Sequence, residues 1–144
     1  MELQQSIPSQ ISAIAPFIEQ LMRFIRNLRK PDGSETDIEL ALQEALANAV
    51  IHGNHEDAQK RVTVICRCSI YGEVSITIRD EGQGFNCGAV PDPTASENRL
   101  STHGRGVYLM QSLMDEVWFD ETGTVVHLRK NANVSAASSG KNKK

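Results

Sequence analysis

The sequence predicts an α/β fold, a two-layer sandwich in which a mixed, mostly antiparallel sheet is covered by about three helices. Two segments in the first half of the chain carry apolar residues at helical spacing. Four later segments are rich in β-branched residues and are joined in pairs by short polar turns. Chains that group helices and antiparallel strands in this way form two packed layers around one core.

The first half of the chain is predicted to be mainly helical. Residues 3–7 predict a short strand, after which apolar residues recur at helical spacing from Ser9 or Ser12 to about Leu28. Residues 30–36 contain a proline and a glycine and therefore predict a turn. A second helix should follow that turn.

The second helix is predicted to begin at a cap on Ser34 or Thr36 and to stop at Gly53. After it, the chain predicts two hairpins with one further helix between them. The hairpin strands are residues 62–70, 74–80, 116–120 and 124–130. The third helix should begin near Gly104 and build its apolar face from Val107, Leu109, Met110 and Leu113.

Composition limits the class of protein. A chain of 144 residues with 40% apolar residues fits one globular domain, predicted at residues 1–130, with residues 131–144 as a disordered polar tail. The net charge of −3 argues against a nucleic-acid binder, which would carry a basic surface. No apolar run reaches the roughly 20 residues that span a bilayer. The N-terminus lacks the features of a secretory signal, so we expect a cytoplasmic protein without membrane contact.

The three cysteines are an odd number for a disulfide framework. Cys66 and Cys68 are two residues apart in a predicted strand and would share a face. They could form half of a metal site, but no other cysteine or histidine has convincing ligand spacing. We interpret Cys66, Cys68 and Cys87 as reduced, buried thiols, since free cysteine behaves as a small apolar residue.

One feature of the second helix does not fit its apolar stripe. Glu44, Asn48 and His52 recur every four residues and so form a polar column on the helix. Polar residues outside an apolar stripe usually face solvent, and that is the simplest interpretation. The alternative is that the column faces a binding site.

Two glycine-containing segments favour a binding site. A predicted strand ends at Asp80 and is followed by Gly82 and Gly84, and a later helix is opened by Gly104 and Gly106. Glycines let the backbone approach a ligand closely, and a helix N-terminus favours a phosphate group. Each segment alone could be a simple turn, but a carboxylate and a phosphate-binding helix start together suit a nucleotide. The motifs of P-loops and of dinucleotide-binding folds are absent.

Three ordered motifs, E-A-x-x-N-A-x-x-H-G, D-x-G-x-G-F and G-R-G-x-x-L-M, resemble the ATP-binding boxes of the gyrase, histidine kinase and MutL (GHKL) superfamily. The short chain, the box HGRGVYLM and the following MDEV resemble more narrowly the anti-sigma-factor serine kinases of the SpoIIAB and RsbW type. The resemblance extends over about residues 36–130 and implies the GHKL ATPase/kinase fold.

The resemblance also implies ATP and Mg²⁺ as ligands and a role for each matched residue. Glu44 corresponds to the general base, and Asn48 to the asparagine that helps to hold Mg²⁺. Asp80 corresponds to the acceptor of the adenine amino group, with Gly82 and Gly84 lining the base. The residues of the phosphate-binding box are Gly104, Arg105, Gly106 and Val107. Thr124 corresponds to a threonine near the adenine, although it could be an ordinary strand residue.

The family further implies a function and partners. Such a protein is a serine/threonine kinase that holds a sigma factor or a similar regulator, phosphorylates a small antagonist protein, and forms a homodimer. The loop at about residues 85–103 corresponds to a mobile lid over the nucleotide. Two alternatives stay open: a nucleotide-gated binding module without phosphotransfer, and an ATPase that uses water as the acceptor.

Overall fold

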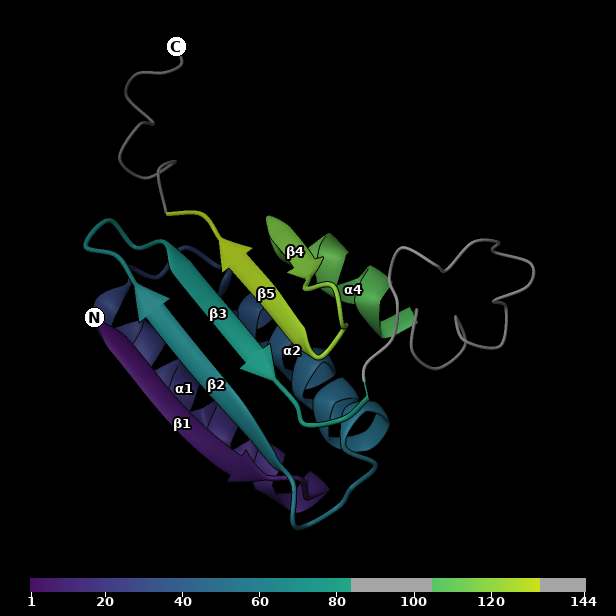
Figure 1. The fold of residues 1–144 in the computed structure, drawn as a ribbon. Coiled ribbons are helices and arrows are strands. Elements are labelled where there is room, and N and C mark those ends of the chain that lie inside the picture. The colour runs from purple at the N-terminus through teal and green to yellow at the C-terminus, as the bar shows by residue number, and fades with distance from the viewer. Residues whose placement is uncertain (84–104, 133–144) are drawn as a thin grey trace, which may run out of the picture.

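The computed structural model describes residues 1–83 and 105–132, except the side chain of Arg105. Within these ranges, five strands form one sheet in the order β1-β2-β3-β5-β4. The strands are β1 (Glu2–Pro8), β2 (Arg61–Cys68), β3 (Val74–Arg79), β4 (Glu116–Phe119) and β5 (Val125–Lys130). The helices lie behind the sheet in Figure 1, all on one of its faces. The predicted two-layer sandwich is therefore confirmed.

Neighbouring strands in the described part of the sheet are all antiparallel. The prediction of a mostly antiparallel sheet is confirmed there, but no parallel pair is present among the described strands. The chain reaches β2 from β1 through two helices, which return it to the end of the sheet at which β1 stops. Pro8 at the end of β1 accordingly pairs with Arg61 at the start of β2. A single crossover helix would have made these two strands parallel. The two predicted hairpins, β2–β3 and β4–β5, are confirmed.

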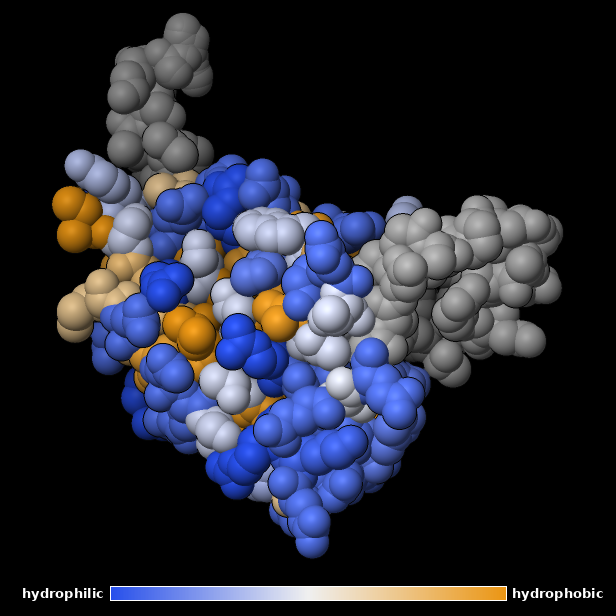
Figure 2. Space-filling view, viewed as in Figure 1, coloured by the Kyte–Doolittle hydropathy of each residue, from blue (hydrophilic) through white to orange (hydrophobic). Residues whose placement is uncertain are grey.

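The helices are α1 (Ile14–Leu28), α2 (Glu35–Ala47) and α4 (Arg105–Leu113). A short 3-10 turn, η1 (Ile11–Ala13), precedes α1, so the α-helix begins later than either predicted serine cap. None of the helices in the described ranges is long and apolar enough to cross a membrane. The core lies between helices and sheet, and its fully buried members include Leu21, Ile25, Leu42, Leu46, Val64 and Ile76. The opposite face of the sheet is mainly hydrophilic, as Figure 2 shows.

The second helix does not continue unchanged to Gly53. It becomes a π-helix, η2 (Asn48–Gly53), directly after α2. The N–H of Asn54 donates to the carbonyl of Ala49, five residues earlier, at 2.9 Å, which is the bonding pattern of a π turn. A π turn holds more residues than an α turn and therefore rotates the side chains that follow Asn48. Single π turns are rare and often lie at functional sites.

The inward face of α4 differs from the prediction at one position. Leu109 is 38% exposed and is not part of the apolar face. α4 packs against α2, and Gly106, Met110 and Met114, the residue just after α4, are buried at intervals of four residues. This spacing turns Leu109 toward solvent. The partly buried residues of the predicted face are Val107 and Leu113.

Cys66 and Cys68 are free and buried on the inward face of β2, as predicted. A hydrogen bond with Cys68, together with burial, raises the pKa of Cys66, which therefore stays a neutral thiol. Among the described residues, no group of three or more histidine, cysteine or acidic side chains could hold a metal. Cys87 lies outside the described residues.

Arg29 is a buried polar residue that joins distant parts of the fold. The residue is 4% exposed, and its guanidinium donates hydrogen bonds to the carbonyl of Gly72 (2.9 Å) and the carbonyl of Asn131 (2.9 Å). It also donates to Asp32 Oδ1 (3.1 Å) and Ser34 Oγ (2.6 Å). These bonds connect the end of α1 to the β2–β3 turn and to the end of β5. A buried charge that is satisfied in this way should be costly to remove.

We expect Arg29→Met to lower the free energy of unfolding by roughly 3 kcal/mol, because it leaves the buried carbonyl of Gly72 without its donor and removes the ion pair with Asp32. Urea unfolding followed by circular dichroism measures this. The matched control is Arg26→Met: the Arg26 side chain is 53% exposed, lies 3.6 Å from Glu39, and should cost less than about 1 kcal/mol. Equal losses for the two variants would contradict the role of Arg29.

Candidate functional site

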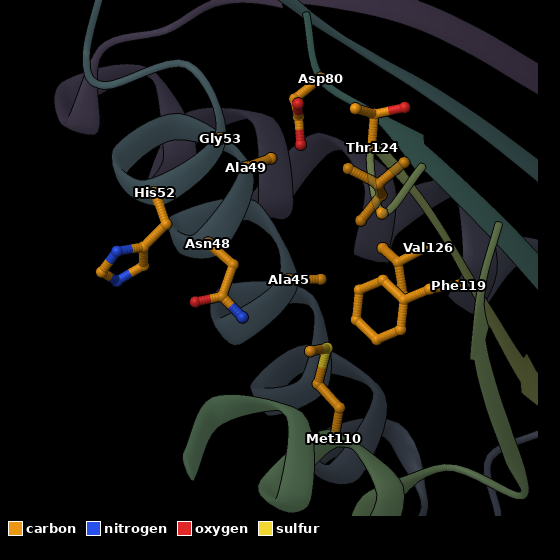
Figure 3. A pocket seen from close by; sticks show the side chains of 12 residues that line it. Ala45, Asn48, Ala49, His52, Gly53, Asp80, Met110, Phe119, Thr124 and Val126 are labelled. Carbon is orange, nitrogen blue, oxygen red and sulfur yellow. The ribbon is translucent and has the colours of Figure 1, made fainter. Parts of the chain in front are cut away.

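A pocket lies between the end of the second helix, the ends of β3 and β4, and α4 (Figure 3). Asp80 and Thr124 lie side by side at one end of it, and Asn48 lies toward the other. The apolar residues of its wall are Ala45, Ala49, Ile78, Met110, Phe119 and Val126. An apolar pocket with a few polar groups at its ends is typical of a small-molecule site.

Asp80 stands where β3 ends, beside the start of β5. Its N–H donates to the carbonyl of Thr124 at 2.9 Å, and its Oδ1 accepts from the N–H of Gly82 at 2.8 Å. Burial raises the pKa of Asp80, against the opposing hydrogen bond from Gly82, and the negative charge of Asp120 adds to the increase. Its carboxylate is incompletely solvated and would gain from a hydrogen-bond donor on a ligand.

Two glycines bring the second helix and the turn after β3 into close contact. A Cβ atom on Gly53 would lie 2.4 Å from Asp80 Oδ2, and one on Gly82 would lie 1.9 Å from the carbonyl oxygen of Gly53. No larger residue fits at either position without moving the backbone or the carboxylate. The H-G and D-E-G motifs, which are far apart in the sequence, therefore meet at Asp80.

Thr124 is held on the pocket wall by the β4–β5 turn. The Asp120 carboxylate accepts from the N–H of Gly123 (2.8 Å) and of Thr124 (3.1 Å). Although burial alone would raise it, hydrogen bonds from Thr122 and from the backbone of the turn hold the pKa of Asp120 below its ordinary value. The Thr124 hydroxyl lies 2.8 Å from the hydroxyl of Thr122. The turn thus places Thr124 beside Asp80, and its role near an adenine stays a prediction.

Glu44 and Asn48 face α4. A Cβ atom on Gly106 would lie 2.9 Å from Glu44 Oε1 and 3.2 Å from Asn48 Nδ2, so the first turn of α4 packs directly on both side chains. These two members of the predicted column face the site instead of bulk water. His52 is exposed, and Figure 3 shows its ring at the outer edge of the pocket. The predicted column is therefore broken where the π-helix begins.

Asn48 provides the observation that bears on a metal ion. Within the described residues, Asn48 Nδ2 is the buried side-chain nitrogen that has no hydrogen-bond partner. Burial of an unpaired amide is unfavourable by about 1–3 kcal/mol, so a polar partner is expected here. Rotation of the amide would present its oxygen, a hard ligand of the kind that Mg²⁺ prefers. Asn48 therefore fits the predicted metal-binding role.

Some predicted residues are not placed in the pocket by the described structure. Gly84, Gly104 and the predicted lid lie outside the described residues. Arg105 begins α4, but its side chain is not described. Val107 is partly buried and packs against the core. The roles of these residues stay predictions.

Two residues at the Asp80 end of the site are not among the predicted site residues. The sequence pattern predicts Gly53 only as a helix stop and predicts no role for Asn54, which lies behind the pocket wall. The histidine and glycine that end the first motif, E-A-x-x-N-A-x-x-H-G, were the available signal for Gly53. Asn54 had no local signal, because its partners are distant in the sequence.

Comparison with known families agrees with this geometry. A model of the histidine kinase-like ATPase domain matches residues 7–130, and this is the class of protein that the fold and the pocket define. An anti-sigma F factor of Bacillus licheniformis is 33% identical over 129 residues, which cover 86% of this chain and 83% of that protein. An anti-sigma F factor of Bacillus thuringiensis is 34% identical, with 95% of both chains covered. The chain therefore belongs to the histidine kinase-like ATPase family, and within it to the anti-sigma-factor type represented by SpoIIAB and RsbW.

Solved structures show the same fold. The RsbU and RsbW domains of a Mycobacterium tuberculosis protein superpose with a TM-score of 0.65 at 19% identity, over 92% of this chain and 32% of that one. A histidine kinase domain from Erythrobacter litoralis gives a TM-score of 0.55 at 17% identity, over 91% of this chain and 64% of that one. These likenesses support the fold, and the family assignment makes the chain a kinase-like ATPase that uses ATP.

Proposed function

We propose that this chain is a cytoplasmic, ATP- and Mg²⁺-dependent serine/threonine protein kinase that acts as an anti-sigma factor and phosphorylates a small antagonist protein. One observation carries the proposal. Glu44 and Asn48 meet Gly106 at one end of an apolar pocket, and Asp80 stands at the other end. The two ends of the pocket thus offer separate places for the base and for the phosphates of one nucleotide.

Adenine would lie between the apolar walls of the pocket. Asp80 would accept a hydrogen bond from the amino group of the base, which compensates the incomplete solvation of its carboxylate. Ala49, Ile78 and Met110 would cover the ring. Thr124 would contribute its hydroxyl beside Asp80.

The phosphates would lie toward the first turn of α4. Gly106 has no side chain to block their approach, and a helix N-terminus favours negative charge. Arg105 would add a guanidinium fork for phosphate oxygens, and Gly104 would precede it in the same box. Asn48 would hold Mg²⁺ through its amide oxygen. When bound, Mg²⁺ neutralises charge that develops on the phosphate oxygens.

Glu44 would act as the general base. Its carboxylate would take the proton from a serine or threonine hydroxyl of the antagonist protein. The hydroxyl oxygen then forms a bond to the γ-phosphorus while the bond between that phosphorus and the ADP oxygen breaks. The proton ends on Glu44, and ADP leaves. Within the described residues, none of the ion pairs involves the Glu44 carboxylate.

The partners follow from the relatives. The curated relatives are named anti-sigma F factors, and we extend binding of a sigma factor to this chain by analogy. A homodimer is a further expectation from the resemblance.

The test is phosphotransfer to a small antagonist protein encoded beside this chain. Both purified proteins are incubated with ATP and Mg²⁺, and the products are analysed by mass spectrometry and by an assay for inorganic phosphate. Phosphoserine or phosphothreonine on the antagonist supports the proposal. Release of inorganic phosphate alone would identify an ATPase, and nucleotide binding without either product would identify a binding module.

A further inference from the structure

Asn54 is a fully buried polar side chain whose hydrogen bonds reach three separate segments. It is 0% exposed. Its Nδ2 donates to Ser9 Oγ at 2.7 Å and to the carbonyl of Arg61 at 3.1 Å. Its Oδ1 accepts from the N–H of Glu81 at 2.7 Å. The amide therefore has a partner for both its oxygen and its nitrogen.

These partners lie outside the pocket, in segments that meet at its Asp80 end. Ser9 follows β1, Arg61 begins β2, and Glu81 is the residue after Asp80. Glu81 is held a second time, because its Oε1 accepts from the N–H of Arg61 at 2.8 Å. Asn54 thus connects the ends of the first three strands, while its own backbone continues from Gly53.

The carboxylate of Asp80 depends on this backbone for its position. Among the described residues, its one hydrogen-bond donor is the N–H of Gly82, which directly follows the residue held by Asn54. On its other side, Asp80 is in contact with Gly53, which directly precedes Asn54. One contact of the carboxylate, Gly82, is therefore adjacent to the residue that Asn54 holds, and the other, Gly53, is adjacent to Asn54 itself.

The backbone after Asn54 indicates that this arrangement is held against strain. His55 and Glu56 both have positive φ angles, 54° and 56°. Two consecutive non-glycine residues in the left-handed region cost free energy and persist only where the surroundings enforce them. Enforcing hydrogen bonds are present from Glu56 N–H to the Val50 carbonyl (2.7 Å) and from Asp57 N–H to the Asn54 carbonyl (3.0 Å). Such strain is commonly found at functional sites.

We infer that Asn54 is a positioning residue for base recognition, which holds the Asp80 carboxylate where it can accept from the amino group of adenine. The inference rests on the proposed binding of ATP. Asn54 does not line the pocket, so it acts on the nucleotide only through Gly53, Asp80 and Gly82. Its loss should therefore affect the distinction between bases more than the binding of phosphates.

The experiment compares ATP with inosine triphosphate, which carries an oxygen in place of the adenine amino group. Calorimetric affinities with Mg²⁺ are measured for the wild type, Asn54→Ala, Asp80→Asn and the double variant. In the wild type we expect a preference for ATP of about tenfold or more. Asn54→Ala should lower this preference toward equal affinity for the two nucleotides, and in the Asp80→Asn background it should change the preference by less than about twofold.

A matched control separates positioning from general loss of stability. Arg29→Lys weakens a buried hydrogen-bond centre at the other end of β3, near Gly72, and should lower the melting temperature without changing the ATP preference. If Asn54→Ala does not fold, Asn54→Ser provides the same test, because its hydroxyl is too short to reach the N–H of Glu81.

The outcomes distinguish the inference from the function on which it rests. If the wild type binds no ATP, the proposed function fails. If the wild type prefers ATP and the folded Asn54 variants keep that preference, the function stands and the inference is wrong. Equal loss of preference in Arg29→Lys would also overturn it, because the effect would then be general.

Discussion

Asp80→Asn is expected to weaken ATP binding by about a hundredfold and to raise the melting temperature at neutral pH. The asparagine keeps an oxygen for the N–H of Gly82, so the local hydrogen bond survives. It loses the charged acceptor for the adenine amino group and places an N–H₂ in the pocket, at a cost of about 1.5–3 kcal/mol. The substitution also removes a carboxylate whose ionised form is disfavoured by burial and by the charge of Asp120. Its removal should therefore stabilise the unliganded fold.

The pH dependence follows from the same shift. The pKa of Asp80 is raised above its ordinary value of 3.8, so between these two values the folded state binds more protons than the unfolded state. The contribution of Asp80 to stability is full below the ordinary pKa and is lost as pH rises through the raised pKa. The affinity for ATP should change in the opposite direction and fall as pH drops through the raised pKa, because the ionised carboxylate accepts the hydrogen bond.

Calorimetry and thermal unfolding measure both effects of Asp80→Asn. Asp57→Asn is the matched control, since it makes the same change of charge at an exposed carboxylate that caps a surface turn. It should leave ATP affinity unchanged. Wild-type affinity in Asp80→Asn, or an equal loss in Asp57→Asn, would contradict the role given to Asp80.

Glu44→Gln is expected to slow phosphotransfer by about 10² to 10⁴, the usual contribution of a general base. ATP affinity should stay within about threefold, because the amide has the same shape and the base does not bind adenine. The rate is measured as phosphorylated antagonist formed per unit time at saturating ATP. Glu39→Gln makes the same chemical change on α2, where the Glu39 side chain is 40% exposed and pairs with Arg26, and should have no effect.

Gly106→Ala tests the geometry around Glu44 independently. The added Cβ would lie 2.9 Å from Glu44 Oε1, and the carboxylate must move to accommodate it. The expected result is a slower phosphotransfer in a chain that still folds, because alanine is a better helix former than glycine.

For the Glu44→Gln prediction, a variant with the wild-type rate would show that another group is the base.

The strands and helices could be predicted because each element depends on local periodicity and local turns. β2 and β3 alternate inward and outward residues, and the predicted second helix begins after Ser34. The sequence could not predict the π-helix, because Ala49 and Val50 continue the apolar spacing of the helix before them. Asn54, which follows the π-helix, is held by tertiary hydrogen bonds to Ser9 and Glu81, which lie 45 and 27 residues away in the chain. Leu109 was misplaced for a similar reason, since helical spacing cannot tell which of two adjacent apolar residues meets α2.

The site was predictable where its chemistry is carried by motifs. Glu44, Asn48, Asp80 and Thr124 all lie at the site, from three separate segments of the chain. The apolar walls were not predictable as walls, because Ile78 and Met110 have the same spacing as core residues. Asn54 could not be predicted as a positioning residue, because its partners lie 7 to 45 residues away in the chain and no local pattern connects them.

The most direct measurement of the central claim is calorimetric titration of ATP, with and without Mg²⁺, into the wild type and Asn48→Ala. We predict that the wild type binds ATP and that Mg²⁺ strengthens the binding. In Asn48→Ala the strengthening by Mg²⁺ should be lost, since the amide that lacks a partner among the described residues is the proposed ligand. A wild-type chain that binds no adenine nucleotide under either condition would contradict the claim that this pocket is an ATP site.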